Sequence, residues 1–293
     1  MTGRGIAKSF LAHEQAEGEG ARVRRSIGSM KARNFSPFLL LDHLVATGKG
    51  FPDHPHRGQE TITYVLQGNV DHEDFTGSKG TIGRGDLQFM TAGKGIVHAE
   101  MPREGDSGEP PEIMQLWVDL PIELKACEPK YKNLRAEEIP VADPSDKVQV
   151  WVISGESYGT KSVQDLAYTP VVFYDYRVQP GGKISQPVPK GFNVFLYLLH
   201  GHIKINRDTE VPEHHCVLFD EDGDSIEADV DESAENEARF ILVGGQKLDQ
   251  PVVQYGPFVE TSSDLVKQAF MDYQSAKNGF ERLQGWYSQI DHE

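Results

Sequence analysis

The sequence predicts an all-β protein with two barrel or sandwich domains in tandem and short helices near the C-terminal end. Short stretches rich in β-branched and aromatic residues recur along the chain, separated by clusters of glycine and polar residues. The first half and the second half match when shifted by 133 residues. Apolar residues adopt three- and four-residue steps only after position 262, where the period becomes helical.

The first half contains a series of strand candidates. Residues 36–43 are predicted to form a turn and a buried strand that ends on Asp42 and His43, a polar pair that either belongs to a site or bonds to a neighbouring loop. The segment Glu60 to Leu66 predicts a strand, and the following Gln67-Gly68-Asn69 predicts a turn. Further candidates are Val70 to His72, Gly80 to Ile82, Asp86 to Thr91 and Ile113 to Leu120.

The connection between the domains is predicted between Ile122 and Asp146, where three prolines and many charges interrupt any long element. Strands are expected to resume at Val148 to Ile153 and at Val171 to Val178. We therefore assign residues 1–135 to an N-terminal domain that binds metal. Residues 136–293 are assigned to a C-terminal domain that lacks metal ligands and includes the final helices.

The 133-residue shift indicates a duplicated barrel. It aligns Gly58, Tyr64, Leu66, Gly68 and Val70 with Gly191, Tyr197, Leu199, Gly201 and Ile203. The same shift places His54 and His56 on Pro187 and Pro189, and Glu60 on Asn193. The imidazoles of the second copy, His200, His202, His214 and His215, do not reproduce the pattern, although His200 and His202 share a strand face.

The segment Ser262 to Trp286 predicts two helices that pack against a barrel. Thr261, Ser262 or Ser263 can cap the first helix, and Gly279 separates it from the second.

Charge and cysteine content exclude several classes of protein. A formal charge of -16 over 293 residues disfavours binding to nucleic-acid phosphates or anionic membranes. The ten acidic residues between Asp220 and Glu237 favour a solvated loop over a calcium or partner site. Cys127 and Cys216 are too few for a disulfide framework and indicate reduced thiols. With neither a targeting segment between Met1 and Gly20 nor a long apolar run, we expect a cytoplasmic or nuclear monomer.

Two ligand patterns lie about forty residues apart, His54-Pro55-His56 and His98-Ala99-Glu100. Residues two apart in a strand point to one face, so each pattern directs two ligand-type side chains the same way. Three imidazoles and a carboxylate without thiolate suit iron(II), manganese, nickel, copper or zinc, and leave coordination positions open. The sequence predicts a metal site of His54, His56, His98 and Glu100.

Glu60 is an alternative carboxylate, because strand parity places it on the face of His54 and His56. A regular strand separates it from His56 by roughly 13 Å, whereas a ligand atom lies ~2 Å from its metal. We prefer Glu100 as the ligand and Glu60 as a residue that contacts the ligands or ends the strand, although a bulge at Gly58 can shorten the separation.

The two histidine-containing motifs, His54 to Gly58 with Glu60 and Met90 to Glu100, resemble those of the pirin family within the cupin superfamily. Phe38 to His43, Gln115 to Trp117 and Gln254 to Phe258 match as well. The resemblance covers nearly the whole chain. It implies a bicupin of two jelly-roll barrels with iron(II) held by His54, His56, His98 and Glu100.

The resemblance implies two classes of function. The first is an enzyme similar to quercetin 2,3-dioxygenase, which opens flavonol-type substrates with dioxygen. Glu100 would act as base if it detaches from the metal. Gln115 would either bond the bound ligand or pack in the core, and Met90 would either line the pocket or pack in the core. The second is a metal-dependent, redox-sensitive binding module, which acts through protein partners as a nuclear transcription cofactor.

Overall fold

The computed structural model describes residues 2–17, 21–46, 50–106, 108–163 and 167–290. The chain divides into two compact units that each draw on separate stretches of sequence. The His unit comprises Glu14–Ser29, Phe38–Ala136 and Leu248–Glu293, and the second unit comprises Met1–His13, Met30–Pro37 and Glu137–Lys247.

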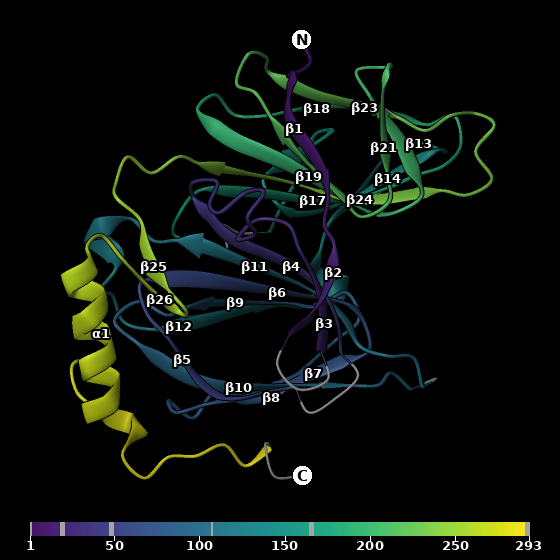
Figure 1. Cartoon of the computed structure of the whole chain (residues 1–293). Coiled ribbons are helices and arrows are strands. Elements are labelled where there is room, and N and C mark those ends of the chain that lie inside the picture. The colour runs from purple at the N-terminus through teal and green to yellow at the C-terminus, as the bar shows by residue number, and fades with distance from the viewer. Residues whose placement is uncertain (1, 18–20, 47–49, 107, 164–166, 291–293) are drawn as a thin grey trace. The chain divides into compact units, whose positions relative to one another are not determined.

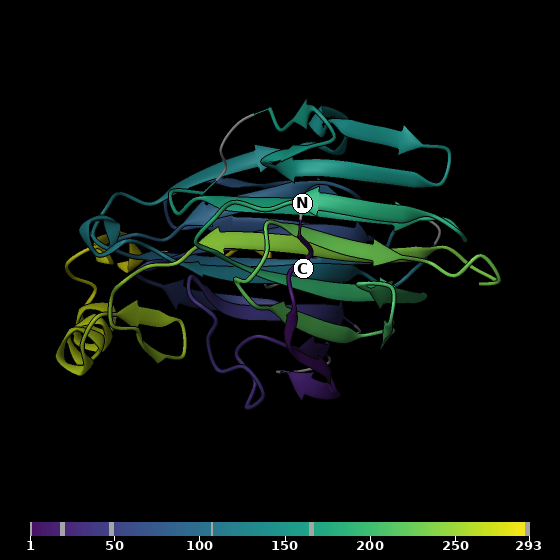
Figure 2. The same cartoon turned by 90° about the horizontal axis from the view of Figure 1, so that it is seen from above.

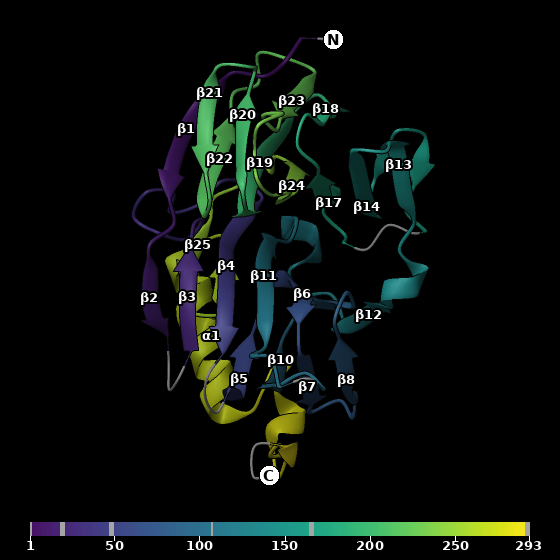
Figure 3. The ribbon, with the colours of Figure 1, turned by 90° about the vertical axis from the view of Figure 1, so that its right-hand side faces the viewer.

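The His unit contains a seven-stranded sheet and a four-stranded sheet, whose strands Figure 3 shows in succession. The larger sheet has the order β12-β9-β6-β11-β4-β3-β2, and the smaller has the order β5-β10-β7-β8. Their bounds are β2 (Glu14–Glu17), β3 (Ala21–Arg25), β4 (Phe38–Ala46), β5 (Phe51–His56), β6 (Gln59–Gln67), β7 (Asn69–Asp74), β8 (Lys79–Gly83), β9 (Leu87–Thr91), β10 (Ile96–Arg103), β11 (Glu112–Asp119) and β12 (Lys130–Leu134). The central strands β6 and β9 are buried along almost their whole length, as their β-branched and aromatic residues predict.

Strand β5 is an edge strand, since β10 is its neighbour on one side in the sheet order. Its sequence includes Pro52 and Pro55, which lack an N–H for a ladder and are tolerated at a sheet edge. The edge position therefore allows a histidine strand that contains two prolines.

The C-terminal segment belongs to the His unit. It contains β25 (Val253–Tyr255), β26 (Phe258–Glu260), α1 (Ser263–Ser275) and the 3-10 turn η3 (Glu281–Leu283), and Figure 1 shows α1 beside β25 and β26. The hydroxyl of Ser262 caps α1 by accepting from the Leu265 N–H. Phe258, Ala269 and Phe280 pack into one buried cluster with Met90 and Ile96 of the barrel.

The second predicted helix is one 3-10 turn, η3. Ala276, Asn278 and Gly279 all have positive φ, a conformation that ends a right-handed helix and prevents its continuation. A second short 3-10 turn, η1 (Ile122–Leu124), follows β11.

The second unit has the same construction. Its seven-stranded sheet has the order β1-β22-β19-β24-β17-β14-β13, and its four-stranded sheet has the order β18-β23-β20-β21. In Figure 2 the long strands of the larger sheet run side by side. Its elements are β1 (Ile6–Leu11), η2 (Ala136–Glu138), β13 (Val141–Ser145), β14 (Val148–Ser154), β15 (Glu156–Ser157), β16 (Thr160–Lys161), β17 (Val171–Val178), β18 (Lys183–Pro187), β19 (Phe192–His200), β20 (His202–Ile205), β21 (Thr209–Pro212), β22 (His215–Phe219), β23 (Ser225–Asp229) and β24 (Ala238–Gln246).

The two units match strand for strand, which confirms the all-β tandem-barrel fold. Strand β6 and strand β19 begin at residues 59 and 192 and end at residues 67 and 200, the predicted shift of 133. Strand β18 takes the place of β5 at the edge of the smaller sheet. Among the described residues, the structure contains no helix long and apolar enough to cross a membrane.

The polar N-terminal stretch and the predicted connection both contribute strands. Strand β1 extends the larger sheet of the second unit beside β22, while β2 and β3 extend that of the His unit. Within the connection, β12 joins the sheet of the His unit and β13 joins that of the second unit.

Candidate metal centre

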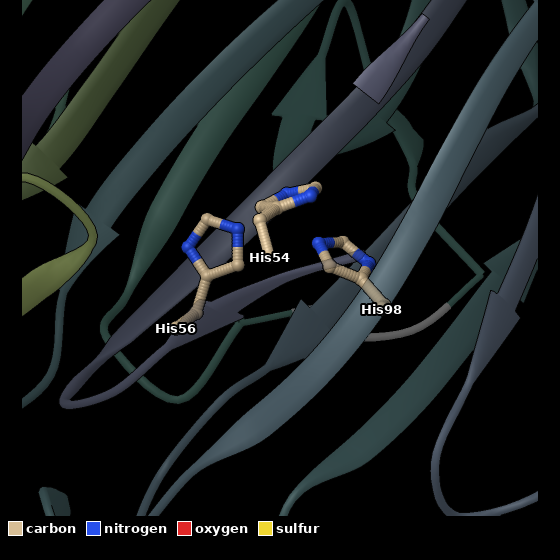
Figure 4. A group of neighbouring side chains, drawn as sticks. All are labelled: His54, His56 and His98. Carbon is tan, nitrogen blue, oxygen red and sulfur yellow. The ribbon is translucent and has the colours of Figure 1, made fainter. Parts of the chain in front are cut away.

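Antiparallel pairing of β5 with β10 brings the two histidine motifs together. His54 lies opposite His98, and His56 lies opposite Ile96. Because alternate residues share a face, His56 projects to the same side as His54. Figure 4 shows the three imidazoles directed toward a common point.

The three imidazoles are close enough to share one cation. Their ring centroids are separated by 4.4 Å between His54 and His98, and by 5.0 Å between His56 and each of the other two. One nitrogen from each ring lies within 4.8 Å of the others. Since a metal-bound imidazole nitrogen lies about 2 Å from its metal, nitrogens at this spacing can surround a single ion.

The surroundings of the rings fit a metal ion. Burial lowers the pKa of His54, and it lowers the pKa of His56 and of His98 well below the usual range, with a further contribution from the neighbouring imidazoles in the latter two. The rings are therefore neutral at physiological pH, the state in which imidazole binds metals. In the described part of the chain, neither ring nitrogen of His98 has a hydrogen-bond partner, although the side chain is only 1% exposed. A buried orphan of this kind is costly unless an ion or water completes it.

The tautomer of His54 follows from its hydrogen bond. Nδ1 of His54 lies 2.8 Å from the carbonyl oxygen of Pro52, which can only accept. The proton therefore sits on Nδ1, and the lone pair of Nε2 is available to a cation.

Glu100 is buried and lies two residues from His98, but its hydrogen bonds are to Thr63 and Gln115 and not to the imidazoles. Its carboxylate accepts from the Thr63 hydroxyl at 3.1 Å and from Nε2 of Gln115 at 3.4 Å. Burial raises the pKa of Glu100 to about 7, against a smaller lowering by the Thr63 hydrogen bond. The group of ligand atoms within 4.8 Å of one another contains the three imidazoles and does not include Glu100.

Glu60 and Thr63 both lie on β6, but their side chains point to opposite faces of the sheet. Residues directly opposite one another in paired strands share a face, so Gln115 lies on the face of Thr63. Met90 is opposite Thr61 and lies on that same face, although it also packs in the cluster with Phe280. Glu60 alternates to the other face, where it accepts from the Thr91 hydroxyl at 2.8 Å.

The structure adds contacts around the imidazoles that the sequence motifs do not reveal. Trp117 meets the His56 ring edge to face, with centroids 5.1 Å apart. Nε2 of Gln59 lies 2.7 Å from Nδ1 of His56. The sequence could have indicated Thr63, because Thr61 and Thr63 put two polar side chains on one face of a strand whose centre is mainly apolar. It gave no comparable indication for Gln59.

A second polar group lies on β7. His72 and Asp74 are buried at alternate positions and lie opposite Glu100 and His98 respectively. The ring of Tyr131 stacks on His72, with centroids 6.1 Å apart. Tyr131 lies in the part of the predicted connection that was assigned to the N-terminal domain, but no strand was predicted there, so its contact with His72 could not be inferred from the sequence.

Two jelly-roll units of one topology, one of which carries three converging imidazoles, define a bicupin with a candidate metal centre. The Pirin family model matches residues 20–118, and the model of the pirin C-terminal cupin domain matches residues 173–279. The chain belongs to the pirin family.

Relatives match over nearly the full length. A pirin-like protein of Solanum lycopersicum is 46% identical over 286 residues, covering 97% of this chain and 96% of that protein. The pirin of Homo sapiens is 46% identical over 291 residues, covering 97% of each.

Solved structures share the fold. A quercetin 2,3-dioxygenase from Acinetobacter baumannii superposes with a TM-score of 0.86 at 30% identity, covering 95% of this chain and 99% of that one. A bacterial pirin from Escherichia coli in complex with nickel(II) has a TM-score of 0.63 at 21% identity, covering 82% and 100%. The second likeness concerns the fold alone.

Proposed function

We propose that this protein is a metal-dependent dioxygenase of the quercetin 2,3-dioxygenase type, with iron(II) held by His54, His56, His98 and Glu100. The convergence of three neutral imidazoles, of which His56 and His98 are buried and His54 is half-buried, is the observation that carries the proposal. It is supported by the likeness to a quercetin 2,3-dioxygenase over 95% of the chain. When bound, iron(II) supplies Lewis acidity and a redox-active centre with open positions for oxygen ligands.

Glu100 is the proposed base. Burial raises the pKa of Glu100 to about 7 in the site without metal, so its carboxylate is more basic than that of an exposed glutamate. Once detached from the iron, it would accept the acidic hydroxyl proton of a flavonol. Hydrogen bonds from Thr63 and Gln115 orient the carboxylate. Gln115 also carries the amide that would bond a bound flavonol oxygen.

The face of β6 that carries Thr61 and Thr63 would form the wall of the substrate site. Trp117 and Met90 lie opposite Thr61 and present apolar surface suited to an aromatic ring. Met90, Thr61 and Thr63 are buried and Trp117 is partly buried, so water is largely excluded beside the base and its polar contacts are strengthened.

Dioxygen uptake tests the proposal. Iron(II)-loaded protein is mixed with a panel of flavonols in an oxygen electrode, alongside His56→Ala and the matched control His200→Ala, whose imidazole is exposed in the second unit. We expect uptake in the wild type and the control, and none above background in His56→Ala. Iron-loaded wild type that consumes no dioxygen with any flavonol would reject the enzyme and leave the metal-dependent binding module.

A further inference from the structure

Arg57 follows the ligand His56 and connects it to the C-terminal segment. Its Nη1 donates to Oδ2 of Asp272 on α1 at 2.8 Å, and its Nε donates to the Lys94 carbonyl at 2.7 Å. Its Nη2 donates to the carbonyl of Asn278. The charged side chain is therefore buried and bonded on three sides, which fixes the backbone beside the ligand.

The C-terminal side of this contact is equally constrained. Asp272 accepts from Gln268 and from Asn278, each at 2.8 Å, in addition to Arg57. Phe280 is fully buried, and its ring lies 4.8 Å from the guanidinium carbon of Arg57. The arginine is held by charge, hydrogen bonds and an aromatic face together.

Backbone contacts continue the connection beyond Arg57. The N–H of Arg57 donates to the Pro257 carbonyl at 3.2 Å, and the N–H of Val259 donates to the Arg57 carbonyl at 3.1 Å. Nζ of Lys125 donates to the carbonyls of Gly58 and Val259 at 2.9 Å and 3.0 Å. The strand end that carries His56 is therefore attached to residues 257–259 on both sides of Arg57.

The side chain of Gln59 also contacts both His56 and Pro257. Its carboxamide lies against Nδ1 of His56 at 2.7 Å and against the Pro257 carbonyl at 3.3 Å. Among the described residues, Oε1 of Gln59 has no hydrogen-bond partner. If the carboxamide is rotated, Oε1 can accept from Nδ1–H of His56 and leave the Nε2 lone pair of that ring to a cation, but the hydrogen bond to the Pro257 carbonyl is then lost. Gln59 therefore orients the imidazole directly, whereas the contact with residues 257–259 depends on the backbone of Arg57 and on Lys125.

We propose that residues 257–280, which we call the C-terminal clasp, are a positioning element for the metal ligand His56. The clasp acts through Arg57, while Gln59 orients the imidazole of His56 directly. Cation binding and docking of the clasp are then thermodynamically coupled, so each strengthens the other by the same factor. The inference rests on the proposed metal centre and does not depend on dioxygenase activity.

Metal affinity is the first test. Metal-free protein is titrated calorimetrically with nickel(II), which is stable in air, for the wild type, Asp272→Asn and Gln59→Leu. The matched control is Asp264→Asn, on the same helix but exposed and paired with Lys267. We expect affinity to fall roughly tenfold to a hundredfold in Asp272→Asn and Gln59→Leu, the usual effect of removing groups that orient a ligand, and to stay unchanged in the control.

Hydrogen exchange with and without nickel(II) is the second test, made on the wild type and on Asp272→Asn. We expect nickel(II) to slow amide exchange in α1, and this protection to disappear in Asp272→Asn. Unchanged nickel affinity in Asp272→Asn and Gln59→Leu, or exchange in α1 that ignores nickel(II), would overturn the positioning role alone. Wild type that binds no nickel(II) would overturn the metal centre itself, and the positioning role with it.

Discussion

His54 and His98 lie directly opposite one another across β5 and β10, with ring centroids 4.4 Å apart. Next to this pair the register shifts, so that Glu100 is opposite Phe51. In this structure the carboxylate and the imidazoles make different contacts. Glu100 is hydrogen-bonded by β6 and β11, whereas the histidines face one another.

Replacing His98 with leucine should stabilise the metal-free protein while abolishing metal binding. The substitution removes two buried nitrogens that have no partner among the described residues and retains an apolar side chain of similar size. The expected gain is about 1–3 kcal/mol in the free energy of unfolding, measured by urea denaturation with a chelator present. His200→Leu, at an exposed site, should change it by less than about 0.5 kcal/mol. A loss of stability in His98→Leu would contradict the reading of His98 as an unsatisfied group.

Gly58→Ala should destabilise the protein severely. Gly58 has a φ of 76°, and an added Cβ would lie 2.0 Å from the Val259 carbonyl oxygen, so the strand and the C-terminal clasp would have to move apart. We expect a cost above about 3 kcal/mol, combining backbone strain with the overlap. Gly77→Ala is the matched control, because its φ is 92° but no atom lies within 4 Å of the added Cβ. It should cost only about 1 kcal/mol, and equal thermal shifts for the two variants would refute the argument.

Glu100 should give the metal-free protein a stability that falls with rising pH. Burial raises its pKa from 4.5 to about 7, so between these values the folded state binds a proton that the unfolded state has released. The contribution is fully present below about pH 4.5 and is lost as the pH rises through about 7, with a total near 3 kcal/mol. Comparing chelator-treated wild type with Glu100→Gln at pH 5 and pH 8 isolates this effect. The free energy of unfolding of Glu100→Gln, relative to that of the wild type, should be higher at pH 8 than at pH 5. The same difference between the two proteins at both pH values would exclude the raised pKa.

The second unit should depend on a buried polar cluster where the first has its histidines. The Tyr176 hydroxyl donates to Oε1 of Gln186 at 2.6 Å, and the same oxygen accepts from Ser157 at 2.6 Å. Tyr176→Phe should lower the free energy of unfolding by about 1–2 kcal/mol, since it removes the buried hydrogen bond to Gln186 and the contact of the hydroxyl with Oγ of Ser157. Tyr158→Phe removes a hydroxyl from a half-exposed ring that accepts from the Ser185 N–H, and should cost less. If Tyr176→Phe and Tyr158→Phe had the same denaturant midpoint, the buried polar cluster would contribute nothing to the stability of the second unit.

Local pattern was enough to predict the strands and the duplication. Strand β6 is rich in β-branched and aromatic residues, as expected of a buried strand. The glycines that flank it, Gly58 and Gly68, recur 133 residues later as Gly191 and Gly201, so the tandem barrels were predictable. The short N-terminal strands were not, because β1 to β3 carry charged residues on exposed faces and gain their partners from distant strands. Strand formation at such positions depends on a neighbour that the local sequence does not identify.

The sequence by itself determined that His54 and His56 share a face, that His98 belongs to a second such pattern, and that the second barrel lacks both. These follow from the two-residue period of a strand and from comparison of the two halves. Tertiary structure alone decided that Glu100 contacts Thr63 on one face of β6 while Glu60 contacts Thr91 on the other. It also decided how β5 and β10 align, and that residues 248–293 form part of the His unit. The physical reason is that register, buried hydrogen-bond partners and the docking of Asp272 on Arg57 are contacts between residues far apart in the chain, and no local period specifies them.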